Sequence, residues 1–236
     1  MKTNNILSIS VDIGKEIIKS GGEISRAEDT VIRINKAFGK SCQVFALPSF
    51  IIAQCEGETE MRRIEREDTD LNRLSNLNTL SRKICKDKNI NTKISSNSIY
   101  SQFILLIFSC IATSSFSIFF GGGIKDAITS FFIAGIITYL DLQHLKIPLF
   151  TDNLICAFLS TILAYIPLKL GLFINPDKVI IGTIMLLVPG LTIVSSIRDM
   201  MSGDLIAGIF ELINAIMSAF GIALGVAGGI AVINWI

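Results

Sequence analysis

The sequence predicts an α-helical polytopic membrane domain of about five transmembrane helices, preceded by a small cytoplasmic α/β domain. Half of the 236 residues are hydrophobic, and the mean hydropathy of +0.60 is too high for an ordinary soluble domain. Charged residues are concentrated in residues 1–99, whereas Ile, Leu, Phe, Ala and Gly dominate residues 100–236. We therefore assign residues 1–99 to the soluble domain and residues 100–236 to the transmembrane helical domain.

The soluble part contains the patterns of three helices and three strands. Apolar residues at helical spacing predict a helix that ends at Ser20–Gly22 and a second that ends at Gly39. A third helix is predicted from Leu71 to Ile84 by the same spacing. Between them lie three short β-prone runs, separated by Pro48 and Gly57, at residues 42–49, 50–57 and 59–66. These elements are enough to build a small α/β layer with one core.

Several classes of activity are disfavoured by composition. Residues 1–99 contain no histidine and no phosphate-binding GxxxxGK[ST] loop, so we expect neither an enzyme nor a cofactor site there. Glu23, Glu28 and Asp29 could do acid–base work, but charges on such a helix more commonly form a solvated or partner-facing surface. The single histidine, His144, has no second ligand nearby, so no metal site is expected. A net charge of +1 without a basic patch argues against nucleic acid.

Cysteine usage and the chain start indicate the compartment. The five cysteines are odd in number, scattered and without a CxxC pair, which favours reduced or buried thiols. The opening "MKTNNILSISVDIG" has too short an apolar run for a secretory signal. Lysines cluster just before the first apolar segment, which favours a cytoplasmic N-terminal domain; they are Lys83, Lys86, Lys88 and Lys93.

Five apolar segments are long enough to suggest membrane spans, since a spanning helix needs about 20 mostly apolar residues. Short polar loops separate them, and an odd number of spans places the two termini on opposite sides of the membrane. The segments lie at about 100–120, 124–140, 153–170, 179–197 and 205–233.

The fourth span contains a proline, and its end is charged. Pro189 removes a backbone donor and clashes with the preceding turn, so the helix should kink or break there. In secondary transporters, interrupted helices present half-helix ends to substrate; the alternative is a structural kink. We therefore propose a substrate or ion pathway along this segment, which comprises Pro189, Gly190, Thr192, Ser196, Arg198, Asp199 and Asp204.

The fifth span carries an acidic residue and regularly spaced glycines. Counting from Asp204, Glu211 lies roughly 10 Å into a hydrocarbon layer about 30 Å thick. A carboxylate at that depth is costly unless it is paired, protonated or hydrated, so Glu211, with Asn214 beside it, joins the proposed pathway. The alternative is an interfacial or structurally paired residue. We expect helix packing from three glycines spaced four apart, Gly221, Gly225 and Gly229.

The order of these motifs resembles that of the threonine/serine exporter family. "SGGEISRAEDTVIRINKAFG" is similar to its opening signature, and "LPSFIIAQ" to its strand pair. "FGGGIKDAI" and "MLLVPGLTIVSSIRDMMSGDLIAGI" are similar to its membrane segments. The resemblance covers nearly the whole chain in order. It implies roles for Gly203 and for the cytoplasmic motif, which comprises Ser20, Gly21, Gly22, Glu23, Arg26 and Glu28.

This resemblance implies a multi-pass exporter of small metabolites in the lipid bilayer of the bacterial inner membrane. Single-chain members carry a second set of spans, so the chain resembles the larger subunit of a split system with a small membrane-protein partner, and a higher oligomer is possible. The implied substrate is an amino acid, threonine or serine, with a dicarboxylate such as succinate as the alternative. Arg198 or the half-helix end near Gly190 would attract the substrate carboxylate, and Glu211 or Asp199 would carry a coupled proton. The rival functions are a membrane-anchored scaffold and a passive channel.

Overall fold

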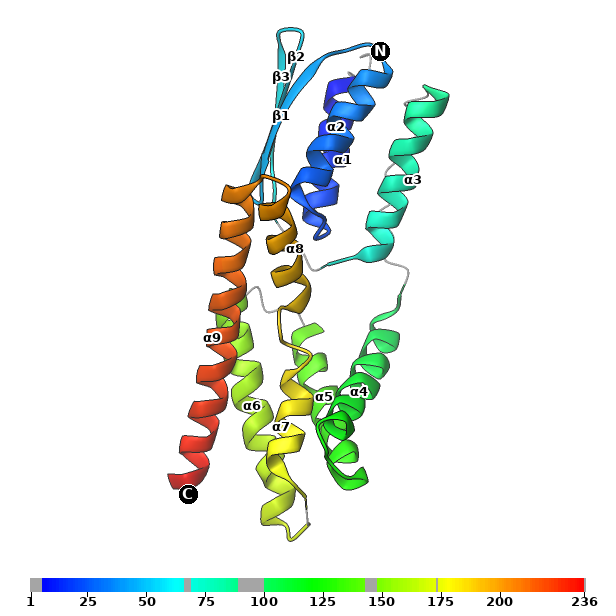
Figure 1. Ribbon diagram of the computed structural model, residues 1–236. Coiled ribbons are helices and arrows are strands. Elements are labelled where there is room, and N and C mark those ends of the chain that lie inside the picture. Colours follow the sequence, from blue (N-terminus) through cyan, green and yellow to red (C-terminus); the bar gives the residue numbers. More distant parts are fainter. Residues whose placement is uncertain (1–5, 66–68, 89–99, 143–147, 173, 236) are drawn as a thin grey trace. The chain divides into compact units, whose positions relative to one another are not determined.

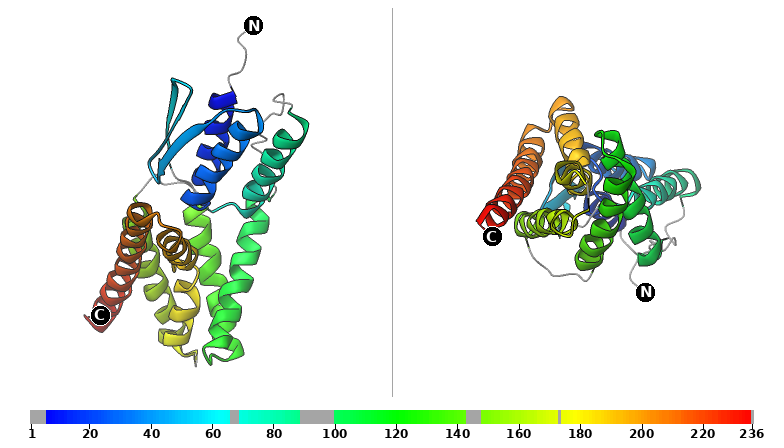
Figure 2. Two further views of the ribbon diagram at one scale, coloured as in Figure 1. Left: turned by 45° about the horizontal axis from the view of Figure 1, so that its top comes forward. Right: turned by 90° about the horizontal axis from the view of Figure 1, so that it is seen from below.

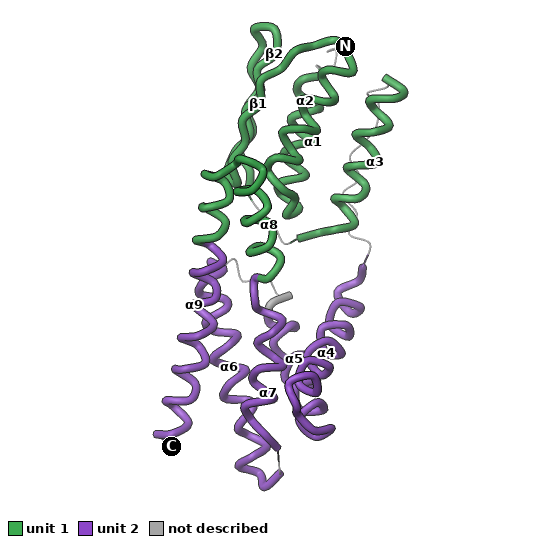
Figure 3. The backbone as a smooth tube through the Cα atoms, viewed as in Figure 1, with its two compact units in different colours: residues 1–99, 190–213 green, residues 100–189, 214–236 purple. Residues whose placement is uncertain are grey.

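The computed structural model describes residues 6–65, 69–88, 100–142, 148–172 and 174–235. The chain is mostly helical and forms two compact units (Figures 1 and 3). Unit 1 contains residues 1–99 and 190–213, and unit 2 contains residues 100–189 and 214–236. Lys93 and His144 lie outside the described residues.

Unit 1 confirms the order of elements predicted for the N-terminal part. Helices α1 (Ile6–Lys19) and α2 (Ile24–Ala37) precede strands β1 (Cys42–Leu47), β2 (Phe50–Cys55) and β3 (Glu58–Arg63), and α3 (Leu71–Asp87) follows. The strands form an antiparallel sheet in the order β1-β2-β3. Helices α1 and α2 cover one face of this sheet (Figure 2).

The core of unit 1 forms where the apolar stripes of the helices meet the sheet. Helices α1 and α2 contribute fully buried side chains such as Leu7, Ile17 and Val31, and the strands contribute Ile51. Ala207, from the segment 190–213, belongs to the same core. Residues 190–213, which the sequence assigns to the transmembrane domain, therefore pack with the N-terminal elements.

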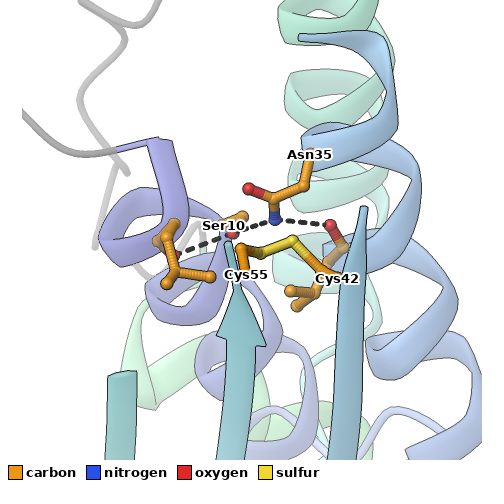
Figure 4. The surroundings of a disulfide bond; sticks show 6 residues. Ser10, Asn35, Cys42 and Cys55 are labelled. Carbon is orange, nitrogen blue, oxygen red and sulfur yellow. Dashed lines mark hydrogen bonds between the residues drawn. A yellow bond between two sulfur atoms is a disulfide. The ribbon is translucent and has the colours of Figure 1, made fainter. Parts of the chain in front are cut away.

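Two cysteines in the sheet form a disulfide, which corrects the expectation of reduced thiols. Cys42 and Cys55 are register partners on β1 and β2, with Cα atoms 4.3 Å apart (Figure 4). The sequence interpretation missed the pair because it looked for close spacing along the chain, whereas a hairpin brings residues 13 apart to opposite positions. Cys85, Cys110 and Cys156 are thiols that take no part in this disulfide.

Unit 2 is helical and contains most of the apolar sequence. It comprises α4 (Gln102–Phe119), α5 (Ile124–Leu142), α6 (Leu149–Lys169), α7 (Pro176–Ile184) and the later part of α9 (Leu205–Trp235). Among the described residues, three helices are long and apolar enough to cross a membrane, namely α4, α6 and α9. The expected count of five is therefore not reproduced, although α5 occupies the second predicted segment.

The fourth predicted span is two helices instead of one. Helix α7 ends at Ile184, and α8 (Gly190–Met201) begins directly after Pro189. This confirms the predicted break, because a proline cannot donate the hydrogen bond that would continue the preceding turn. The two halves belong to different helices and different units.

Helix α9 packs against α6 through its glycines. A Cβ atom at Gly225 would lie 2.4 Å from the carbonyl oxygen of Leu154, and one at Gly221 or Gly229 would also meet α6 at 2.7 Å. These positions let the two backbones approach closely. Asn153 of α6 donates a buried hydrogen bond to Ser218 of α9, which adds a polar link between the same helices.

Asp126 near the start of α5 is buried. One carboxylate oxygen accepts a hydrogen bond from the backbone N–H of Gly123 at 2.7 Å. The other accepts one from the backbone N–H of Asn175 at 2.7 Å, just before α7. The side chain therefore holds two loops of unit 2 together.

Candidate functional site: a carboxylate cluster in unit 1

The cytoplasmic motif forms a tight turn between α1 and α2. Gly21 has a φ of +78°, and the backbone N–H groups of Gly21 and Gly22 donate to the carbonyls of Ile18 and Ile17. This is a Schellman turn, in which the left-handed position favours glycine. It ends α1 and makes Glu23 the residue that precedes α2.

Residues 198–204, which we call the Arg–Asp motif after Arg198, Asp199 and Asp204, form the same kind of turn between α8 and α9. Gly203 has a φ of +102°, the N–H of Gly203 donates to the carbonyl of Met200, and the N–H of Asp204 donates to the carbonyl of Asp199. In a Schellman turn, the side chains at the positions of Asp199 and Asp204 lie near each other. The sequence spacing of this motif thus brings two carboxylates together.

The two turns meet within unit 1. The backbone N–H of Ile24 and the hydroxyl of Ser25 each donate a hydrogen bond of 3.5 Å to the carboxylate of Asp199. Next to this contact, Arg198 forms an ion pair with Glu23. Asp199 therefore lies at the N-terminus of α2, where the positive end of the helix dipole stabilises a negative charge.

Burial shifts the titration of Asp199. Its side chain is 0% exposed, and this burial raises the pKa of the carboxyl group from 3.8 to about 6. The hydrogen bond from Ile24 opposes the rise, whereas the negative charges of Glu211, Glu23 and Asp204 add to it. Asp199 can therefore gain or lose a proton close to neutral pH.

A second carboxyl group of the cluster behaves in the same way. Glu28, one turn further along α2, accepts a hydrogen bond of 2.6 Å from the backbone N–H of Ala46. Its pKa is raised to about 7, mainly by burial. The hydrogen bond lowers the pKa, whereas nearby negative charges, that of Asp204 first, contribute to the rise. The pKa of Asp204 is also raised, by burial and by the charge of Asp29.

Glu211 faces α8. Its side chain is 1% exposed, and the hydroxyl of Ser195 donates to it at 3.3 Å. A Cβ atom at Gly208 would lie 2.6 Å from the carbonyl oxygen of Ser196, so α8 and the start of α9 are in close contact there. Glu211 is therefore buried in a close contact between these two segments.

Helix α9 is longer than the hydrocarbon layer is thick. The 31 residues of α9 give a length of about 46 Å, which exceeds the hydrocarbon layer of about 30 Å. About ten residues of α9 therefore extend beyond that layer if the helix runs perpendicular to it. The segment that contains Glu211 packs in unit 1, so its burial comes from protein contacts.

The remaining residues of the predicted pathway are not all part of this cluster. Asn214 lies on the exposed side of α9, Pro189 belongs to unit 2, and the hydroxyl of Ser196 donates to the carbonyl of Ile193 within its own helix. Thr192 is partly buried on α8. Gly190 begins the same helix.

Two further polar residues of the cytoplasmic motif, Ser20 and Arg26, make no described contact with the carboxylates of the cluster. Arg26 is exposed on α2. The hydroxyl of Ser20 is buried, without a hydrogen-bond partner among the described residues. Within the described part of the chain, no group of three or more His, Cys, Asp or Glu side chains could hold a metal ion.

Comparison with known proteins identifies the family of this chain. Residues 8–233 match the family described as "Putative threonine/serine exporter". The chain belongs to the threonine/serine exporter family. Membership in this family of transporters confirms the prediction that the chain is not an enzyme, and with the apolar helices it indicates a membrane protein.

Two curated proteins are similar to this family member. A "Threonine/serine exporter" of Corynebacterium glutamicum is 24% identical over 249 residues, which cover 95% of this chain and 50% of that protein. An uncharacterized protein of Schizosaccharomyces pombe is 23% identical over 184 residues, which cover 71% of this chain and 22% of that protein. The chain thus spans about half of the length of one relative and about a fifth of the other. No solved structure matches it.

Sequence reasoning about this threonine/serine exporter family member missed several contacts of the cluster. It did not connect Glu23 with Arg198, it treated Glu28 as a surface charge, and it did not single out Ser25 or Ser195. The glycine of each turn was a usable signal, because a Gly at the end of a helix predicts a Schellman turn. The pairing of the two turns depends on tertiary packing and left no pattern along the chain.

Proposed function

We propose that this chain is a subunit of a secondary transporter that exports small amino acids, with threonine and serine as the first candidates, and that export is coupled to the proton gradient. Family membership supports the transport class. The observation that carries the coupling is the position of Asp199, which is buried between the cytoplasmic motif and the Arg–Asp motif.

Proton coupling needs groups that change protonation at cellular pH. Asp199 and Glu28 meet this need, since burial raises their pKa values to about 6 and about 7. Because burial at this contact raises the pKa of Asp199, loss of its proton would place a desolvated charge between α2 and α8 and weaken their contact, whereas protonation would strengthen it. A proton would thus alter the link between the two motifs.

The charges around Arg198 favour an amino acid over the alternative of a dicarboxylate. Arg198 can attract one carboxylate, but Glu23 pairs with it, and Glu28, Asp199 and Asp204 lie in the same cluster. A dianion such as succinate would bring a second negative charge to this acidic surface. The ammonium group of threonine or serine would instead reduce the repulsion.

The transport cycle that we propose has three steps. The substrate binds at Arg198 while Asp199 is protonated and the two motifs are in contact. Loss of the proton from Asp199 then loosens α8 from α2, and the break at Pro189 lets α8 move separately from α7. Uptake of a proton restores the contact. Export against a gradient would follow if the proton is taken from one side of the membrane and released to the other.

We also propose the bacterial cytoplasmic membrane as the location, with the N-terminal elements in the cytoplasm. Lys83 and Lys86 in the last turns of α3, and Lys88 after it, precede the first apolar helix, which supports this orientation. A membrane-protein partner would supply further helices to the pathway.

Flux measurements in everted membrane vesicles would test the proposal. Vesicles from cells that lack the native gene, complemented with the wild-type chain, should accumulate threonine in a saturable way when their interior is made acidic, and a protonophore should abolish the accumulation. Non-saturating flux would instead indicate a channel. Absence of flux in the complemented vesicles, with the chain present in the membrane, would indicate a scaffold.

A further inference from the structure

We propose that Glu23 of the N-terminal elements is a specificity-determining residue that contacts the substrate: a zwitterionic amino acid opens the Glu23–Arg198 ion pair and bridges it. The substrate carboxylate takes the place of Glu23 on the Arg198 guanidinium, and the substrate ammonium group binds the released Glu23 carboxylate. This inference rests on the proposed export of amino acids. It adds a direct substrate contact from the cytoplasmic motif.

The ion pair is accessible to a small molecule. The side chain of Arg198 is 60% exposed and that of Glu23 is 21% exposed. An exposed ion pair contributes little to stability because water solvates both partners well when they separate. Opening this pair therefore requires little energy, and a substrate that pairs with both released charges replaces the lost interaction with two charge-assisted hydrogen bonds.

The backbone holds the two charges in fixed places. Glu23 immediately precedes α2, yet its side chain makes no capping hydrogen bond, so the carboxylate is available to a partner outside its own helix. The Schellman turn before it and the contact of Asp199 with Ile24 fix the backbone on both sides of the pair. Such preorganisation lowers the entropic cost of binding.

The other charged groups of the cluster are not equivalent to Glu23. Asp199 is buried and receives hydrogen bonds from Ile24 and Ser25, and Glu28 is engaged with the backbone of β1. Glu211 is buried against α8. Asp204 and Asp29 lie close enough to each other for the charge of Asp29 to raise the pKa of Asp204. Glu23 is thus the carboxylate with which Arg198 forms its ion pair.

The alternative is that the pair only joins α2 to α8. The two cases differ in which variants change the affinity for substrate. If the pair is only structural, Glu23→Gln lowers the amount of folded protein and the maximal flux, and the KM for threonine stays the same. If Glu23 contacts the substrate, the KM rises and the response to substrate analogues changes.

The test uses threonine flux in everted vesicles that contain the native assembly, with the amount of chain in the membrane measured for each variant. Glu23→Gln and Arg198→Gln should raise the KM for threonine by about tenfold or more, and Glu23→Asp should have a smaller effect. The matched control is Asp12→Asn, which removes a different ion pair of unit 1, that with Arg62 at 2.8 Å, and should leave the KM unchanged.

Substrate analogues test the two halves of the bridge. Threonine methyl ester lacks the carboxylate and N-acetylthreonine lacks the ammonium group, so neither should compete with threonine in the wild-type vesicles. The charge exchange Glu23→Arg with Arg198→Glu should recover part of the affinity lost in the single variants, because a zwitterion can bridge the reversed pair.

The outcomes separate this inference from the proposed function. Saturable threonine flux in the wild type with an unchanged KM in Glu23→Gln would overturn the inference and leave the proposed function standing. Strong competition by N-acetylthreonine would also overturn it. Absence of saturable, proton-dependent flux in the wild type would overturn the proposed function and, with it, this inference.

Discussion

The carboxylate of Asp199 in α8 accepts a hydrogen bond from the backbone N–H of Ile24, the first residue of α2. The two residues are 175 positions apart in the chain. The contact joins the cytoplasmic motif to the Arg–Asp motif within unit 1, and the ion pair between Glu23 and Arg198 accompanies it. The two motifs therefore form one charged site, from which several predictions can be made.

Replacement of Asp199 by Asn should change the pH dependence of stability. The folded-state pKa is raised from 3.8 to about 6, so the wild type loses stability as the pH rises through this range, by about 3 kcal/mol in total. Asn keeps an acceptor for Ile24 without the buried charge. Thermal unfolding in detergent should give a higher Tm for the variant above about pH 7 and similar values near about pH 4.

A matched control for this measurement is Asp177→Asn, which removes an exposed charge near the start of α7. Its pH profile should follow that of the wild type. A Tm difference between Asp199→Asn and the wild type that is the same at both pH values would contradict a buried, titrating carboxyl group at this position.

Glu28→Gln should flatten the pH dependence of threonine flux. Burial raises the pKa of Glu28 to about 7, so the wild-type side chain loses its proton as the pH rises through neutrality. Gln mimics the protonated side chain and can still accept the hydrogen bond from the backbone N–H of Ala46. Flux would be compared between about pH 6 and about pH 8. Asp177→Asn, which removes an exposed charge of unit 2, should retain the wild-type profile; equal profiles for the wild type and Glu28→Gln would refute the assignment.

Gly203→Ala should destabilise the turn between α8 and α9. A Cβ atom at Gly203 meets no atom within 4 Å, but its φ of +102° disfavours a side chain, at a cost of about 1–3 kcal/mol. Gly190→Ala is the matched control, since that site is equally open and has no positive φ. A lower Tm for Gly203→Ala alone is expected, and equal losses in both variants would show that backbone conformation is not the cause.

Gly225→Ala should loosen the packing of α9 on α6. The added Cβ would lie 2.4 Å from the backbone oxygen of Leu154, so the helices must move apart, whereas at Gly228 the nearest atom is a Phe158 ring carbon at an ordinary 3.5 Å. We expect a loss of about 1–3 kcal/mol from Gly225→Ala and little change from Gly228→Ala. Unfolding in detergent would measure both, and similar Tm values would contradict the close backbone contact.

The cysteine pair offers a test of orientation. Cys42 and Cys55 are adjacent on β1 and β2, so the purified protein should yield a disulfide-linked peptide in air, while Cys85 remains alkylatable. If the N-terminal elements face the reducing cytoplasm, rapid acid trapping of intact cells should instead show both thiols free. A linked pair in trapped cells would place this part of the chain in an oxidising compartment.

Much of the secondary structure could be predicted because its signals are local. The apolar periodicity of α1 and α2, the strand runs around Pro48 and the break at Pro189 each depend on a few neighbouring residues. The glycines of α9, spaced four apart, likewise mark positions where another helix comes close. The family resemblance likewise depended on the order of short motifs.

The pairing of the cysteines and the environment of the charged groups were decided by the tertiary structure. A sequence shows that Glu23, Asp199 and Arg198 carry charge, but their burial and partners depend on which helices pack together across 175 positions. The pKa of Asp199 depends on that burial, because desolvation acts only once the surrounding atoms are in place. The sequence by itself therefore determined the elements and their breaks, and the tertiary structure alone decided which charges face each other, since electrostatic interactions depend on distance in space.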